Sequence, residues 1–248
     1  MHAAYDDISL AYKIVHGELT VKKHAEEFTY LNLLGDVHGQ KVLDLACGEG
    51  RFSRTIKRQG ASQVVGVDIS ASMIELARQA ESEQPLGTTY IHSDVAALGT
   101  IGIFDTVSAA FLFNYAASKE VLLTLCRTAY SNLKPGGKLV ASVNATPLYP
   151  PLHNQATRKY GYLVHSPSPL REGDAVEYAF FTGSHAIRLL NVHWSRATYE
   201  WALCEAGFSA CSWQSPTVSQ QGLEQHGHEF WRDFLLEPNF ICLAACRT

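Results

Sequence analysis

The sequence predicts an α/β fold: a seven-stranded, mostly parallel sheet with helices on both faces. Three observations predict it. Short apolar runs rich in Val, Leu and Ile recur along the chain, stretches with helical spacing separate them, and a glycine turn joins the first such pair. Strands that alternate with helices favour a parallel sheet. At 248 residues, 46% of them hydrophobic, the chain can bury a large core as one domain with an addition.

Composition narrows the classes of function. The net charge is −4 and no run of Lys or Arg stands out, which argues against a nucleic-acid partner. No apolar run approaches the roughly 20 residues that span a membrane, and the first residues lack the pattern of a signal peptide. We therefore expect a cytoplasmic protein without a membrane partner, as a monomer or homodimer. The six cysteines show no zinc-like spacing, and His226-Gly-His228 lacks the pattern of a metalloprotease, so no metal is expected.

The glycine turn lies between a predicted strand over 41–45 and a predicted helix over 51–59. Gly48 and Gly50 lack Cβ atoms, so the backbone there can turn sharply and approach a ligand closely. Asp44 places a carboxylate near the carboxyl end of a buried strand. That placement costs several kcal/mol unless a partner satisfies the charge. A ligand that carries an ammonium group would do so.

A second apolar strand, 64–68, ends in Asp68, whose carboxylate is placed to accept hydrogen bonds from the two hydroxyls of a ribose. The spacing also fits a dinucleotide-binding unit, which keeps a nicotinamide-dependent oxidoreductase as an alternative. Ser53, however, stands where that pattern has its third glycine. A cofactor-binding protein without catalysis is a further alternative.

The stretch from Asp44 to Gly50 resembles motif I of the class I S-adenosylmethionine-dependent methyltransferases, with Asp44, Ala46, Gly48 and Gly50 at the family's positions. Two further signatures of that family are Phe104-Asp105 and the Pro135-Gly-Gly turn before an apolar strand. The resemblance is specific over 41–144. It implies a Rossmann-like sheet whose last strand runs antiparallel, with S-adenosylmethionine as cofactor. It also implies further cofactor contacts from Tyr12, Ile69, Met73, Ser93, Asp94, Val95 and Phe111.

The remaining elements follow from periodicity and turn residues. We expect one or two helices within 5–34, which by the resemblance form a lid over the cofactor. The other predicted helices are 71–81 with Ser70 as N-cap, 119–133, 198–207 and 228–235. The other predicted strands are 89–95, 103–110, 139–144, 209–216 and 239–246.

Residues 145–196 break this pattern. Five prolines fall within 147–169, which predicts an irregular covering loop with a short helix, and 172–182 with 186–194 alternate like a hairpin. The resemblance implies that such an insertion roofs the substrate pocket. The predicted organisation is a single domain, 1–248, made of a lid (1–38), a cofactor-binding half (39–144), the cap (145–196) and a C-terminal part (197–248).

Methyl transfer from a sulfonium is an in-line displacement, so the protein mainly aligns the two reactants and excludes water. Asn114 and Tyr115, after the fourth strand, are predicted to hold the acceptor. A general base is needed only for an acceptor that keeps its proton; His153, His165, His185 and His193 are candidates, with His193 taken as catalytic. The predicted substrate contacts are Tyr5, Tyr115, Tyr149, His153, Trp194 and Trp231. The expected acceptor is N or O of a small heteroaromatic or natural-product scaffold, as in antibiotic biosynthesis.

Overall fold

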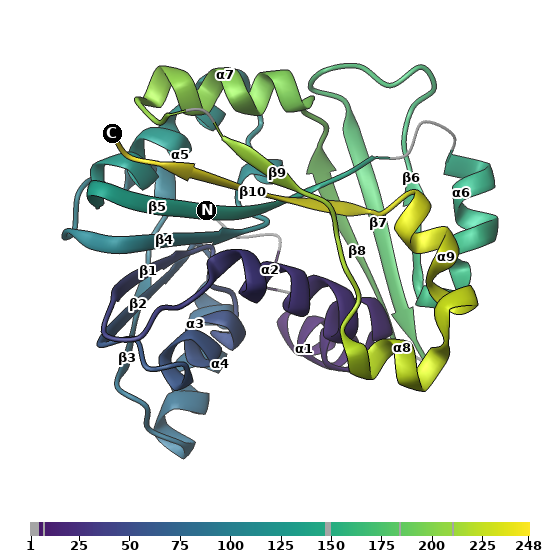
Figure 1. Cartoon of the computed structure of the whole chain (residues 1–248), viewed down its shortest axis with the longest axis horizontal. Helices are drawn as coiled ribbons and strands as arrows, with labels where there is room; N and C mark the ends of the chain where they lie inside the picture. Colours follow the sequence, from purple (N-terminus) through teal and green to yellow (C-terminus); the bar gives the residue numbers. More distant parts are fainter. Residues whose placement is uncertain (1–4, 7, 147–149, 184, 210) are drawn as a thin grey trace.

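The computed structural model describes residues 5–6, 8–146, 150–183, 185–209 and 211–248, and its main sheet has the predicted architecture. Seven strands lie in the order β3-β2-β1-β4-β5-β10-β9 (Figure 1). β10 is antiparallel to both of its neighbours, so the predicted antiparallel last strand is confirmed. The strands are β1 (Lys41–Leu45), β2 (Gln63–Asp68), β3 (Thr88–His92), β4 (Phe104–Ala110), β5 (Leu133–Asn144), β9 (Ser212–Gln214) and β10 (Phe240–Cys246).

Helices cover both faces of this sheet (Figure 1). One face carries α2 (Glu27–Leu34), α3 (Arg51–Arg58) and α4 (Ala71–Glu83), and the other carries α5 (Lys119–Ser131) and α7 (Arg196–Ala206). Ser70 caps α4 as predicted, because its hydroxyl accepts the amide hydrogen of Met73. Before α2 the chain forms α1 (Ser9–Glu18) and a π-helical turn, η1 (Lys22–Glu26).

A second, three-stranded antiparallel sheet lies beside the first one and forms the cap. It contains β6 (Tyr162–His165), β7 (Ala175–Thr182) and β8 (His185–Val192), with α6 (Pro150–Thr157) before it. The paired strands β7 and β8 correspond to the predicted hairpin. β6 was not predicted, and neither was α8 (Gln220–His226), which precedes α9 (His228–Leu236). Three short 3₁₀ turns complete the fold, namely η2 (Val95–Ala97), η3 (Phe113–Tyr115) and η4 (Arg158–Tyr160).

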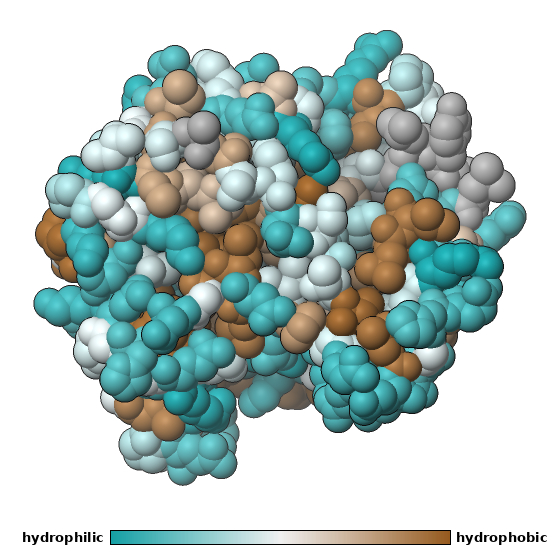
Figure 2. Space-filling model, viewed as in Figure 1, coloured by the Kyte–Doolittle hydropathy of each residue, from teal (hydrophilic) through white to brown (hydrophobic). Residues whose placement is uncertain are grey.

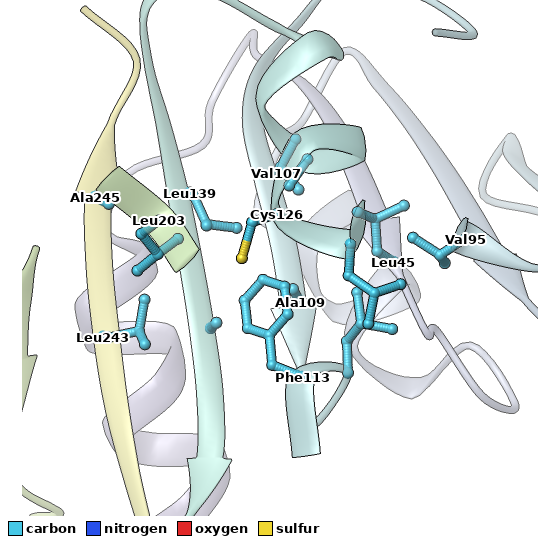
Figure 3. Packing of buried hydrophobic residues seen from close by; sticks show 14 of the residues in the cluster. Leu45, Val95, Val107, Ala109, Phe113, Cys126, Leu139, Leu203, Leu243 and Ala245 are labelled. Atoms are coloured by element: carbon cyan, nitrogen blue, oxygen red, sulfur yellow. The ribbon is translucent and has the colours of Figure 1, made fainter. Parts of the chain in front are cut away.

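Two large hydrophobic cores result from the alternation of side chains along the strands. Leu45 and Val107 belong to the first core, together with Cys126 of α5 and Leu203 of α7 (Figure 3). Val42 and Val64 point to the opposite face, where the second core continues through α2 into the cap and α9. The cap therefore shares its core with the main sheet.

Helix α9 packs in the same hydrophobic core as the cap strands. Trp231 and Phe234 are fully buried, whereas Leu235 and Leu236 are exposed. Figure 2 shows hydrophobic residues, in brown, at the surface over α9. The buried residues anchor one face of the helix in the second core. Within the part of the chain that the structure describes, none of the helices has both the length and the apolar character needed to cross a membrane.

Candidate functional site

The candidate site lies at the carboxyl ends of β1, β2 and β4. The strand order reverses between β1 and β4, and parallel sheets bind ligands at such a point. A cavity of about 320 Å³ opens there. Its wall contains nine predicted site residues, which are Tyr5, Tyr12, Ala46, Gly48, Asp68, Ile69, Met73, Phe111 and Tyr115.

The backbone around this cavity is unusual at two residues that are not glycine. Ala46 and Phe111 have φ angles of 58° and 60°, in the left-handed region that such residues rarely adopt. Ala46 follows β1 and Phe111 follows β4, and both line the cavity. Backbone strain of this kind collects at ligand sites, which supports the assignment of the cavity as the functional site.

The glycine turn and Asp68 hold each other in place. The amide of Gly48 donates to Asp68 Oδ2 and that of Ser70 donates to Oδ1, both at 2.8 Å. A Cβ atom on Gly48 would meet nothing in the protein, so the space beside it is free for a ligand. Gly50 does not line the cavity. A side chain is excluded there because a Cβ atom would lie 2.4 Å from the hydroxyl oxygen of Tyr90.

Asp44 is 1% exposed, and its carboxylate already has partners inside the protein. The hydroxyl of Ser53 donates to Oδ2 at 2.5 Å, and that of Ser108 donates to Oδ1 at 2.7 Å. Burial still raises the pKa of Asp44 to about 6, although both hydrogen bonds oppose that shift. The sequence-based expectation that a ligand must satisfy this charge is therefore too strong, because two serines share the task.

A charged cavity of about 60 Å³ adjoins this carboxylate. Two ion pairs line it: Lys22 with Glu26, both buried on η1, and Arg51 with Glu27. Together with Asp44 they place charges of both signs at one end of the site, while Ile69 and Met73 make the larger cavity apolar. The two cavities together suit a ligand with a ribose-bearing, flat end and a zwitterionic end.

A third, small cavity of about 20 Å³ lies on the cap side of the site. Tyr12 and Phe111 line all three cavities, so the point where they meet lies beside these two rings. His16 and Lys22 line both the charged cavity and the small one. The imidazole of His16 stacks on Tyr12 with centroids 3.7 Å apart, and its Nε2 is buried without a hydrogen-bond partner among the described residues.

Burial shifts the pKa values of His16 and Cys47, which both line the charged cavity, so that both side chains are uncharged. Burial lowers the pKa of His16 well below its usual range, and Lys22 and Arg51 lower it further, so the imidazole is neutral. Burial also raises the pKa of the Cys47 thiol, which stays protonated beside the turn. Cys47 is thus a packing residue rather than a nucleophile.

Several predicted site residues lie elsewhere. Trp231 is fully buried in the second core and donates to the carbonyl of Gly222, so it does not reach a ligand. The indole of Trp194 donates to the carbonyl of Ala116 at 3.0 Å in the first core. His193 lines, with Trp194, a separate cavity of about 190 Å³ rather than the one beside Tyr12. These positions correct the assignments of Trp231, Trp194 and His193.

Four other predicted site residues also lie outside the cavity wall. His153 is 3% exposed on α6, with Nδ1 3.2 Å from Glu237 Oε2, and does not line the site. Ser93, Asp94 and Val95 follow β3 outside the cavity wall, and Asp94 caps η2 by accepting the amide of Ala96. Tyr149 lies outside the described residues.

Sequence reasoning missed His16, Lys22, Glu26 and three asparagines that line the small cavity, at 144, 191 and 239. No local pattern marks them, because tertiary packing brings them together. Ser53 did carry a signal: it replaces the third glycine of the dinucleotide pattern, and its hydroxyl binds Asp44. Among the described residues, no group of three or more His, Cys, Asp or Glu side chains is arranged to hold a metal.

Comparisons with known proteins agree with this geometry. Residues 42–137 match the family model described as a methyltransferase domain. A ubiquinone/menaquinone biosynthesis C-methyltransferase, UbiE, of Yersinia pestis bv. Antiqua is 25% identical over 222 residues, covering 86% of this chain and 84% of the relative.

Solved structures share the fold. An S-adenosylmethionine-dependent methyltransferase from Mesorhizobium loti has a TM-score of 0.65 at 21% identity, covering 94% of this chain and all of that one. The DhpI–SAM–HEP complex has a TM-score of 0.63 at 20% identity, covering 98% of this chain and 94% of that one. The predicted Rossmann-like fold is therefore confirmed, and residues 42–137 match the methyltransferase domain that the sequence pattern indicated.

Proposed function

We propose that this chain is a class I S-adenosylmethionine-dependent methyltransferase that transfers the methyl group to a nitrogen or oxygen of a small, flat acceptor. One observation carries the proposal: the cofactor-sized cavity and the small cap-side cavity meet beside Tyr12 and Phe111. Bound S-adenosylmethionine supplies an electrophilic methyl group on a sulfonium. A planar acceptor would lie between these rings, whose π faces also favour a cationic donor.

The described residues fit that cofactor. Asp68 can accept hydrogen bonds from the ribose while Ile69 and Met73 contact the base. At the other end Asp44 and Glu26 would meet the ammonium group of the methionine part, and Arg51 its carboxylate. Gly48 leaves room for the close approach of the chain that joins the two ends.

The lid and the cap exclude water from the reaction. Tyr5 of the N-terminal segment forms a hydrogen bond with Tyr115 after β4, and their rings meet edge to face at 5.8 Å between centroids. Phe180 and Leu189 from the cap close the other side of the small cavity. A dry site strengthens each electrostatic interaction within it.

An acceptor that carries a proton must lose it, and His16 is the group placed to accept it. Its neutral imidazole lines the small cavity, and Nε2 is free of other partners among the described residues. His193, the candidate taken from sequence, lies away from this point. We therefore assign the role of base to His16.

The test is a screen of heteroaromatic N–H and O–H compounds for release of S-adenosylhomocysteine, with the methylated atom located by NMR. We expect transfer to N or O, and a loss of turnover in His16→Gln of about 10²-fold or more. His193→Gln serves as the matched control and should stay close to wild type. Equal effects of the two substitutions would contradict the assignment of the base.

Methylation at carbon is the second candidate. The relative from Yersinia pestis bv. Antiqua is a C-methyltransferase, and its match covers 86% of this chain. Including hydroquinones in the same screen separates the two candidates, because the NMR spectrum of the product shows whether the methyl group is on carbon or on a heteroatom. A product methylated at carbon would replace our proposal by this one.

A further inference from the structure

Four asparagine side chains line the small cap-side cavity: Asn114, Asn144, Asn191 and Asn239. They come from four separate segments, since the first lies on η3, the second ends β5, the third is on β8 of the cap, and the fourth precedes β10. An asparagine amide offers hydrogen-bond donors and an acceptor, and carries no charge. The fold has thus gathered uncharged hydrogen-bonding groups where the acceptor would lie.

Two of the four asparagines satisfy each other. Asn144 Nδ2 donates to Asn191 Oδ1 at 2.5 Å and joins the main sheet to the cap. The other two do not: both polar atoms of the Asn114 amide and Oδ1 of Asn239 are buried without hydrogen-bond partners among the described residues. Asn114 is 1% exposed and Asn239 3%. Buried polar groups are normally paired, so these three atoms indicate a ligand that completes them.

The charges around the cavity favour a neutral ligand. Lys22 is the cation that lines it among the described residues, and Lys22 is already paired with Glu26. His16 is neutral because burial lowers its pKa. A carboxylate or an ammonium group in this cavity would lose its hydration without gaining a free counter-charge.

We infer that the acceptor presents to Asn114 a neutral edge with adjacent N–H and C=O groups, as a lactam or a carboxamide does. This inference rests on the proposed function and names its class of substrate. An asparagine amide can form two parallel hydrogen bonds with an adjacent donor and acceptor, as it does with the edge of adenine. Asn239 Oδ1 accepts from a further donor. A cavity of about 20 Å³ admits only this edge, while the rest of the ring lies toward Tyr12 and Phe111.

The experiment is a ligand-observed NMR screen of fragments against the protein saturated with S-adenosylhomocysteine. The fragment set holds equal numbers of lactams or carboxamides, carboxylic acids, amines, and aromatics without hydrogen-bonding groups. We expect lactams and carboxamides to be enriched among the fragments that bind. Enrichment of the acids or of the apolar aromatics, or the absence of any binding at this cavity, would overturn the inference.

Asn114→Asp is a sharper test. It replaces the Nδ2 donor by a second acceptor oxygen and adds a negative charge, while the shape of the side chain stays almost the same. Lactams should bind it about tenfold more weakly or worse, and benzamidine, which presents two donors, should bind more tightly than to wild type. Asn32→Asp, an exposed position on α2, makes the same change in charge and should alter neither. Equal lactam affinity in Asn114→Asp and wild type would also overturn the inference.

Calorimetry with S-adenosylhomocysteine distinguishes a failure of the proposed function from a failure of the acceptor class inferred here. If wild type does not bind S-adenosylhomocysteine, the proposed function fails, and the fragment preference can still be measured on the protein alone. If it binds and the fragments show no preference for a lactam edge, the proposed function stands and only the assignment of the acceptor class fails. Retained S-adenosylhomocysteine affinity in Asn114→Asp shows that the variant is folded.

Discussion

Asp44 is held between Ser53 and Ser108, and the chain of hydrogen bonds continues from Ser108 Oγ to the hydroxyl of Tyr30, 2.8 Å away. The titratable groups that interact with this carboxylate from neighbouring elements are Tyr30, Cys47, Asp68 and Tyr90. Burial raises the pKa of Asp44, and both serine hydroxyls lower it by stabilising the ionised form. The result is a carboxylate that changes its charge near pH 6.

This carboxylate makes cofactor affinity depend on pH. Above pH 6 Asp44 is charged and attracts an ammonium group; as pH falls through 6 it becomes neutral and that attraction is lost. Affinity for S-adenosylhomocysteine should therefore fall below pH 6, by up to about tenfold per pH unit. Calorimetric titration between pH 5 and pH 7.5 measures it.

Ser53→Ala removes one of the two stabilising hydrogen bonds, so the pH at which affinity begins to fall should move upward. The exposed Ser82→Ala on α4 is the matched control. 5′-Methylthioadenosine lacks the α-amino group of the amino-acid part and should bind with little dependence on pH. An equal dependence for both ligands would show that another group, such as Asp68, is responsible.

Single residues show where prediction from sequence succeeds and where it stops. Asp68 and Gly48 were assigned from local patterns because a strand end and a turn are local features, and the structure joins them by a hydrogen bond. His16 was missed because nothing in its neighbourhood distinguishes it from the other histidines. Only the packing of α1 against β7 and β8 places its ring in the site.

Among the elements, the π-helical turn η1 is unusual because it places two charged residues in the interior. Lys22 and Glu26 are 6% and 4% exposed, and form an ion pair. The ammonium group of Lys22 also lies over the ring of Phe111, 4.6 Å from its centroid. π-Helical turns are frequent at functional sites, and this one closes the charged end of the cavity.

Lys22→Met should lower the free energy of unfolding by about 3–5 kcal/mol, because it leaves the Glu26 carboxylate buried and unpaired. Lys22→Met/Glu26→Met, which removes both charges, should recover most of that loss. Urea denaturation of the two variants and wild type measures both values. If the double variant is as unstable as the single one, packing rather than charge accounts for the loss.

The elements differ in how well they could be predicted. β1 and β2 are short runs dominated by Val and Leu because both of their faces are buried, and their positions followed from the sequence. β6 was missed because its four residues lie in a proline-rich stretch and gain their strand geometry by pairing with β7. α8 was missed because its seven residues are mostly polar and contain a glycine. Such short elements depend on tertiary contacts rather than on their own periodicity.

At the scale of the whole molecule, the cofactor would touch both hydrophobic cores. Ala46 packs on the first core, and Tyr12 and Phe111 pack on the second, which extends through the cap. All three line the main cavity. Binding at the site should therefore be coupled to the stability of the main sheet and of the cap together.

Two tryptophans can test this coupling, because Trp213 packs on the first core and Trp231 lies in the second. In variants that keep only one of them, with the other tryptophans changed to Phe, we expect the fluorescence transitions in urea to coincide, as for a single cooperative unit. S-adenosylhomocysteine at 100 times its Kd should stabilise both by the same amount, about 2.7 kcal/mol. If the ligand shifts the Trp213 transition and leaves that of Trp231 unchanged, the cap unfolds on its own, and the shared second core does not couple it to the site.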